Sequence, residues 1–259
     1  MKRYFCDIHS SYINELGGES LIIEDSEDVI STRVNAHDAE SFVLYGKALA
    51  KQLRYRDAIA AYSKALEFDS NSYDAHRLRG GRYLTTLDLD NAFKDLEWCL
   101  NAKGENTDVL YVLGLTAFYS EKYNLAREYF ERAILYSDDE MGVAIIYWHT
   151  IASLREKEEA TLLNDKYHMG MDIGHHTAYD KALSLFKGYL SMDSVESMLE
   201  DEDNDLEYSM IEYGIANYYQ AKGDMGKAKK ALDNVLSRDG FWPSFAFIGA
   251  WNDRSRNIL

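Results

Sequence analysis

A repeat of 34 residues constrains this chain more than any other feature of its sequence. Glycines recur with this period, and each is followed by an alanine twelve residues later, a large apolar residue after four more, and a small residue after another three. The aligned sets are Gly46, Ala58, Tyr62 and Ala65; Gly80, Ala92, Leu96 and Cys99; and Gly114, Ala126, Phe130 and Ala133. Four positions that agree in three copies indicate one structural unit stacked on itself.

Each unit is predicted to be a pair of α-helices. Residues 56–66 and 125–135 carry apolar side chains at the spacing of one helix face. The only proline is Pro243, which favours a helical chain because proline is costly inside helices. If the first unit is counted from residue 39, Gly46 and Ala58 are its eighth and twentieth residues. Small residues at these two positions let the helices of the unit approach closely. The large residue at the twenty-fourth is expected to fill the space between neighbouring units.

This pattern resembles the tetratricopeptide repeat, whose consensus has small residues at positions 8, 20 and 27 and large apolar ones at 4, 11, 17 and 24. Frames that start at residues 39, 73 and 107 match well, and the same step continues without insertion to 141, 175, 209 and 243. The frame at 209 is a good repeat, whereas those at 141 and 175 are degenerate. Their second helices place Asn164, Tyr167 and Asp201 where apolar or small residues are expected.

The resemblance implies an all-α fold: a right-handed superhelix of about six hairpins with a C-terminal capping helix that Pro243 begins. The chain then consists of an N-terminal extension, 1–38, whose structure stays open, and a repeat domain, 39–259. Within the extension, residues 11–16 could form a helical turn and 20–24 a strand or arm. Stretches 76–84, 212–219 and 241–248 look like an uncharacterised bacterial subfamily.

Charge and cysteine content restrict the partners and the compartment. The net charge is −16, and residues 138–207 hold seventeen acids against five Lys and Arg. Such a surface repels nucleic acid and anionic membranes, although it could steer a basic partner or simply solvate the chain. Cys6 and Cys99 are too few for a disulfide framework. No apolar run reaches membrane length, so we expect a cytoplasmic protein.

The sequence predicts no enzyme, cofactor or catalytic residue, because it has no phosphate loop, nucleophile elbow or Cys-His pattern. A metal site can be imagined from three histidines and two aspartates: His168, His175, His176, Asp172 and Asp180. We predict none, since adjacent histidines are expected to point in different directions. Arg79 stands where the repeat normally has leucine. An internal ion pair is the favoured interpretation, and recognition of an anion is the alternative.

In the family that the chain resembles, the first helices of the hairpins line a concave groove that binds peptides or helices. The resemblance therefore implies a scaffold or adaptor that binds a segment of a partner protein. Its groove residues would be Lys47, Lys51, Arg77, Tyr111, Phe118, Tyr119, Tyr179, Phe186 and Tyr213. For an open groove, Tyr111, Phe118 and Phe186 should be partly exposed. The alternative is a structural or self-assembling subunit, for example a homodimer, whose groove holds its own N-terminal arm or a second protomer.

Overall fold

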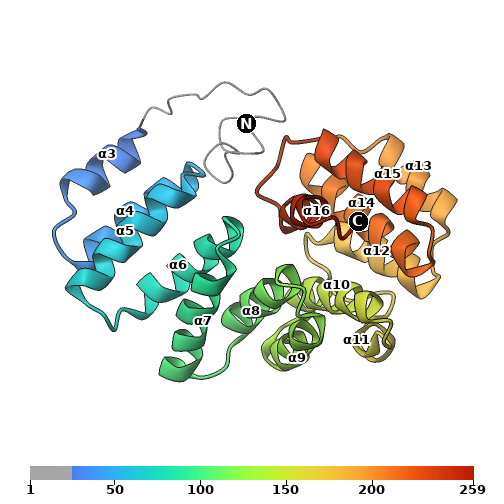
Figure 1. Cartoon of the computed structure of the whole chain (residues 1–259), viewed down its shortest axis with the longest axis horizontal. Coiled ribbons are helices and arrows are strands. Elements are labelled where there is room, and N and C mark those ends of the chain that lie inside the picture. Colours follow the sequence, from blue (N-terminus) through green and yellow to red (C-terminus); the bar gives the residue numbers. More distant parts are fainter. Residues whose placement is uncertain (1–24) are drawn as a thin grey trace. The chain divides into compact units, whose positions relative to one another are not determined.

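The structure is a computed structural model, and it describes residues 25–259. This part of the chain contains fourteen α-helices and one short 3-10 helix and has no strand (Figure 1). The predicted all-α fold of helical hairpins is confirmed. The described part of the chain forms two compact units, which meet at the boundary between Glu105 and Asn106. Within residues 25–259, no helix combines the length and the apolar character that a membrane span requires.

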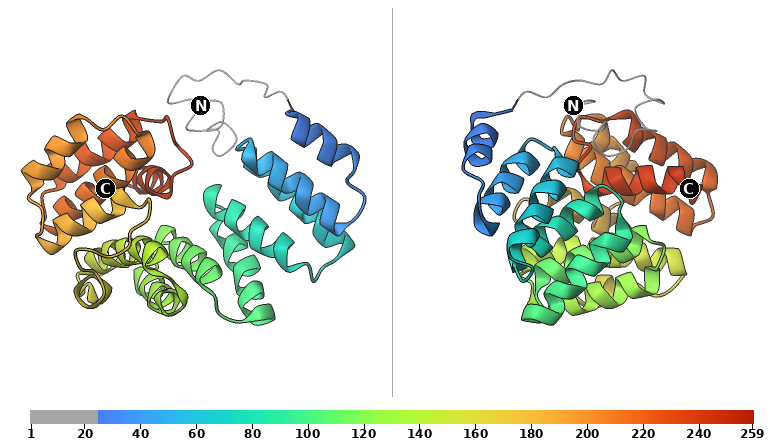
Figure 2. Two further views of the ribbon diagram at one scale, coloured as in Figure 1. Left: turned by 180° about the vertical axis from the view of Figure 1, so that it is seen from behind. Right: turned by 60° about the vertical axis from the view of Figure 1, so that its left-hand side comes forward.

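The first unit contains two helical hairpins and a preceding helix. Its helices are α3 (Glu27–Val34), α4 (Ala39–Lys51), α5 (Tyr55–Phe68), α6 (Tyr73–Thr85) and α7 (Leu89–Lys103). Helices α4 and α5 pack as one hairpin, α6 and α7 as the next, and α5 packs on α6 (Figure 2).

Helix α3 lies in the extension whose structure the sequence left open. Ser26 is the N-cap of this helix: its hydroxyl accepts a hydrogen bond from the Val29 backbone N–H at 3.3 Å. Val29 is fully buried against Ala48 and Leu49 of α4. The turn and the arm expected at residues 11–16 and 20–24 lie outside the described residues.

Glycine at the eighth position of the repeat makes room for the large residue at the twenty-fourth. In the hairpin of α6 and α7, a Cβ on Gly80 would lie 2.8 Å from Leu96 Cγ, closer than carbon atoms can pack. A Cβ on Gly46 would overlap the Tyr62 ring in the same way. The large residue therefore packs inside its own hairpin, so the expectation that it fills the space between units was incomplete.

The second unit begins with a regular hairpin and ends with another. Helix α8 (Thr107–Tyr119) pairs with α9 (Tyr123–Ala133), which a 3-10 turn, Ile134–Tyr136, extends. Near the other end, α14 (Asp205–Ala221) pairs with α15 (Met225–Ser237), and a last helix, α16 (Phe245–Ser255), follows. Ala126 in α9 is fully buried, as its place in the repeat predicts.

The middle of the second unit is irregular. Its helices are α10 (Asp139–Glu156), α11 (Thr161–Asp165), α12 (Thr177–Lys187) and α13 (Met192–Glu200). Helix α11 is only five residues long, and a left-handed Gly188 (φ 79°, ψ 16°) ends α12. Helix α13 buries only Val195 and Leu199. These short second helices occupy the frames that the sequence marks as degenerate.

Candidate functional site

Most of the aromatic residues predicted to line an open groove are buried. The six that fall in the second unit are Tyr111, Phe118 and Tyr119 on α8, Tyr179 and Phe186 on α12, and Tyr213 on α14. Tyr111 and Phe118 are only 6% and 2% exposed, so the expectation that they are open to solvent is wrong. Tyr119, Tyr179 and Tyr213 are buried as well, and only Phe186 is half-buried. Because the other five rings are buried, they do not form a stripe of aromatic side chains that faces solvent.

The chain's own C-terminal helix covers much of this surface, which we call the inner face: the sides of α8, α10 and α14 on which α16 lies. The Phe245 and Tyr111 rings are 6.1 Å apart, edge to face. The Tyr119 hydroxyl donates to the Phe245 carbonyl at 2.5 Å, and the Asn252 amide donates to the Tyr119 carbonyl at 3.0 Å. Within the described residues, the segment that covers this surface is the C-terminal helix. The N-terminal arm that the sequence suggested as an alternative lies outside the described residues.

A buried ion pair fastens α16 to the inner face. Arg155 Nη2 on α10 lies 2.6 Å from Asp253 Oδ2 on α16, and the two side chains are 2% and 3% exposed. The Tyr213 hydroxyl donates to the same carboxylate oxygen at 2.8 Å, and Arg155 Nε donates to Asn217 Oδ1 at 2.7 Å. Burial raises the pKa of Asp253, and the Arg155 guanidinium beside it opposes that rise. Three helices therefore meet at one charge-assisted network.

The three basic residues predicted for the groove lie in the first unit. Lys51 is exposed and its ammonium group lies 3.2 Å from Asp28 on α3. Lys47 on α4 and Arg77 on α6 are half-buried. These side chains remain accessible on the first unit.

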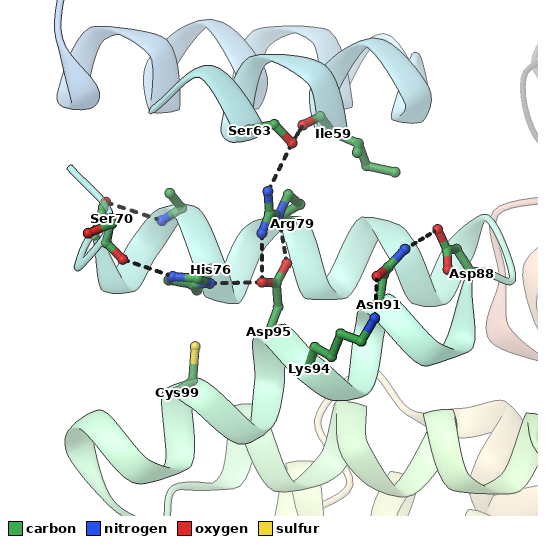
Figure 3. Close-up of polar contacts among 12 residues, drawn as sticks. Ile59, Ser63, Ser70, His76, Arg79, Asp88, Asn91, Lys94, Asp95 and Cys99 are labelled. Carbon is green, nitrogen blue, oxygen red and sulfur yellow. Dashed lines mark hydrogen bonds and ion pairs between the residues drawn. The ribbon is translucent and has the colours of Figure 1, made fainter. Parts of the chain in front are cut away.

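Arg79 is held by internal partners (Figure 3). Its Nε and Nη2 donate to the two oxygens of Asp95 at 2.7 and 2.8 Å, and its Nη1 donates to Ser63 Oγ at 3.0 Å. His76 Nδ1 lies 2.8 Å from Asp95 Oδ1 on the other side of the carboxylate. The predicted internal ion pair is confirmed, and it ties α6 to both α5 and α7. Because its donors are used in this way, Arg79 is not presented to an external anion.

Two of the histidines come together with a glutamate. Donor atoms of Glu140, His175 and His176 lie within 4.8 Å of one another, and His175 Nδ1 is 2.6 Å from Glu140 Oε1. The two imidazole rings are 4.4 Å apart. The expectation that these neighbours point apart is wrong, because both rings lie beside Glu140 and against each other. Three donors are one fewer than a structural zinc site uses, and the His175 side chain is 83% exposed.

A cavity of about 730 Å³ lies between α13, α14 and α15, and we call it the α13–α15 slot. Residues of all three helices line the slot. The lining residues are Met192, Asp193, Glu196, Leu199, Glu200, Tyr208, Glu212, Ile215, Tyr219, Lys227, Lys230, Ala231 and Asn234. The slot combines apolar walls, two tyrosines and charged groups of both signs.

Sequence reasoning missed the slot, although one signal pointed to it. Tyr208, Glu212, Ile215 and Tyr219 follow one another at steps of four, three and four, so they share one face of α14. Glu212 occupies the fourth position of its frame, where the repeat consensus has a large apolar residue. A carboxylate inside an otherwise apolar stripe is costly to bury, and this position deserved selection as a candidate.

The fold and these sites define a protein of stacked helical hairpins, in which one short helix leaves an accessible cavity. The profile of the tetratricopeptide repeat family matches residues 107–140, which include α8 and α9. This match identifies a tetratricopeptide repeat in the hairpin of α8 and α9. No curated protein sequence matches it. Among solved structures, the crystal structure of YrrB, described as a TPR protein with an unusual peptide-binding site, aligns with 90% of this chain and 100% of that chain, at 18% identity and a TM-score of 0.45.

Proposed function

We propose that this protein is a protein-interaction scaffold that holds a segment of a partner protein in the α13–α15 slot. The observation that carries the proposal is the slot itself, an opening of about 730 Å³ between helices of a hairpin-repeat framework. This volume falls in the range of ligand pockets, roughly 300 to 1,000 Å³. Helical-hairpin repeats of this family are typically interaction modules, so binding rather than catalysis is the function that the fold favours.

The slot is a better candidate than the inner face of the second unit. Contacts from α16, including those of Phe245 and Asp253, already satisfy the aromatic and charged groups of that face. A partner would have to displace a helix held by a buried ion pair before it could bind there. In the first unit, Lys47, Lys51 and Arg77 remain a candidate contact surface for an acidic segment.

Site-specific photo-crosslinking tests the location. A photoreactive phenylalanine analogue replaces Met192, which lines the slot, and in a matched variant it replaces Leu135, which is exposed on the same unit outside the slot. We expect a defined partner to crosslink at residue 192 but not at 135, and Tyr219→Ala to reduce that product. Equal products at both positions, or none at 192, would refute binding in the slot.

A second candidate function is a structural subunit whose inner face is used internally. The contacts of α16 with α8, α10 and α14 favour it, because they fill the surface that the family uses for ligands. If two chains exchange α16, the same contacts join them into a dimer. Sedimentation equilibrium tests the exchange of α16: a mass that doubles with concentration supports a dimeric structural subunit, and a constant single-chain mass removes the exchange.

A further inference from the structure

We propose that the α13–α15 slot binds a basic side chain, arginine or lysine, of an extended peptide segment, with Glu212 and Glu196 as the acceptors. This inference rests on the proposed function, since it names the chemistry of the segment that the scaffold holds. Its support comes from the charges that line the slot, the hydrogen bonds of Glu212, the two tyrosine rings and the apolar walls.

The charge of the slot favours a cation. Four carboxylates line it, Asp193, Glu196 and Glu200 from α13 and Glu212 from α14, against the two ammonium groups of Lys227 and Lys230. One of these lysines is already engaged, because the Lys227 ammonium lies 3.9 Å from Asp224 and 4.9 Å from the centre of the Tyr219 ring. The remaining excess of negative charge attracts a cationic group and repels a carboxylate.

Glu212 is the least ordinary residue of the lining. Its side chain is buried, with 6% of the residue exposed. Its Oε1 accepts two hydrogen bonds, from the Tyr208 hydroxyl at 3.3 Å and from Asn234 Nδ2 at 3.0 Å. No residue in the described part of the chain donates to its Oε2. This oxygen is not one of the fully buried atoms that lack a partner, so it is accessible from the slot. A guanidinium or ammonium group in the slot would donate a charge-assisted hydrogen bond to it.

The two tyrosines suit the same ligand. The Arg238 guanidinium lies 4.0 Å from the centre of the Tyr208 ring, and Lys227 lies over Tyr219. Aromatic faces attract cations, and each of these rings already has one of the chain's own cations against it. The Tyr219 hydroxyl also donates to Glu196 Oε1 at 3.5 Å, which holds that carboxylate beside the ring.

The apolar lining explains why the ligand is a side chain with a hydrocarbon stem. Met192, Leu199, Ile215 and Ala231 form the walls between the charged groups. Lysine and arginine pack their methylene groups on such surfaces while the charged end reaches a polar partner. The slot also has room for more than a single cationic head, so the flanking residues of a peptide can contribute contacts.

The test uses the full chain and four fluorescent heptapeptide libraries. Their central residue is fixed as arginine, lysine, citrulline or glutamate, and their flanks are random but uncharged. Citrulline keeps the shape of arginine without its charge. By fluorescence anisotropy, we expect the arginine and lysine libraries to bind about 10- to 100-fold tighter than the citrulline library, because hydrogen bonds to charged groups are worth this much.

Variants assign the effect to the slot. Glu212→Gln should remove the preference for arginine over citrulline, and Glu196→Gln should reduce it. The matched control is Glu128→Gln, which neutralises an exposed glutamate of α9 outside the slot and should leave the preference unchanged. Circular dichroism verifies that each variant is folded. If Glu212→Gln does not fold, the Glu196→Gln variant still decides the result.

Two outcomes would overturn the inference. Tightest binding of the glutamate library would assign the slot to an anion held by Lys227 and Lys230. Equal binding of all four libraries, or none, would remove the basic ligand. If residue 192 nevertheless crosslinks to a partner, the proposed scaffold function stands and only its ligand chemistry is wrong. If crosslinking fails as well, both are wrong.

Discussion

Adjacent glycines in α6 offer a direct test of how the hairpins pack. A Cβ on Gly80 would meet Leu96 Cγ at 2.8 Å and Leu96 Cδ2 at 3.1 Å, whereas a Cβ on Gly81 would have no atom within 4 Å. Neither glycine has a positive φ, so alanine fits the helical backbone at both positions. The two Gly→Ala substitutions therefore share one change in helix propensity and differ in a single steric contact.

The magnitudes follow from those two terms. Alanine is favoured over glycine inside a helix by about 1 kcal/mol, so Gly81→Ala should raise the free energy of unfolding by about 0.5 to 1 kcal/mol. At Gly80 the same gain is offset by overpacking of Leu96, which costs about 1 to 3 kcal/mol. We therefore expect Gly80→Ala to be the less stable variant by about 1 to 3 kcal/mol.

Urea unfolding followed by far-UV circular dichroism measures the difference. The comparison uses one common slope of unfolding free energy against urea concentration for both variants and the wild type. Gly81→Ala should unfold at a higher urea concentration than the wild type, and Gly80→Ala at a lower or equal one. If both substitutions stabilise the protein equally, the close contact between positions 8 and 24 of this hairpin does not exist.

Three further predictions concern the second unit. Asp253→Ala should lower the free energy of unfolding by about 3 to 5 kcal/mol, because it leaves Arg155 buried without its partner. Asp233→Ala removes an exposed pair with Arg254 and should lower it by only about 0 to 1 kcal/mol. Thermal or urea melts of the two variants measure the difference. Tyr111→Ala combined with Phe118→Ala should lower the melting temperature strongly, since both rings are buried; an unchanged melt would restore the open groove. Burial raises the pKa of Glu212, so the folded state holds its proton to higher pH than the unfolded chain does, and stability falls as the pH rises from the ordinary carboxyl range of about 4 to 5. Glu212→Gln should therefore gain stability relative to the wild type as the pH increases through that window, which melts from pH 4 to 8 measure. Because Tyr208, Glu196 and Lys230 face the same slot, the readout is the difference in stability between the variant and the wild type at each pH.

The sequence predicted the architecture well because the repeat depends on local packing. Gly80 and Leu96 are sixteen residues apart and belong to one hairpin, so their sizes must match wherever the unit occurs. This requirement produces the 34-residue period of the sequence. The same logic marked the frames at 141 and 175 as degenerate, because Asn164, Tyr167 and Asp201 stand where apolar or small residues are expected.

The inner face could not be predicted in the same way. The repeat position of Tyr119 places it on the first helix of a hairpin, but the partners of its hydroxyl and carbonyl, Phe245 and Asn252, lie more than 120 residues away in the sequence. No periodic signal links such distant residues. Aromatic side chains at groove positions are equally compatible with an open groove and with a groove filled by the chain itself. Only the structure distinguishes the two.

Helix α14 connects the inner face with the slot. Tyr213 and Asn217 point toward Arg155 and Asp253, whereas Glu212, one residue before Tyr213, points into the slot. One side of α14 is thus fixed by a buried ion-pair network, and the other carries a buried carboxylate against a cavity. Burying the Glu212 carboxylate costs free energy, and packing on the opposite side of α14 offsets part of that cost. The contacts of α16 therefore stabilise the same helix, α14, whose other side lines the slot.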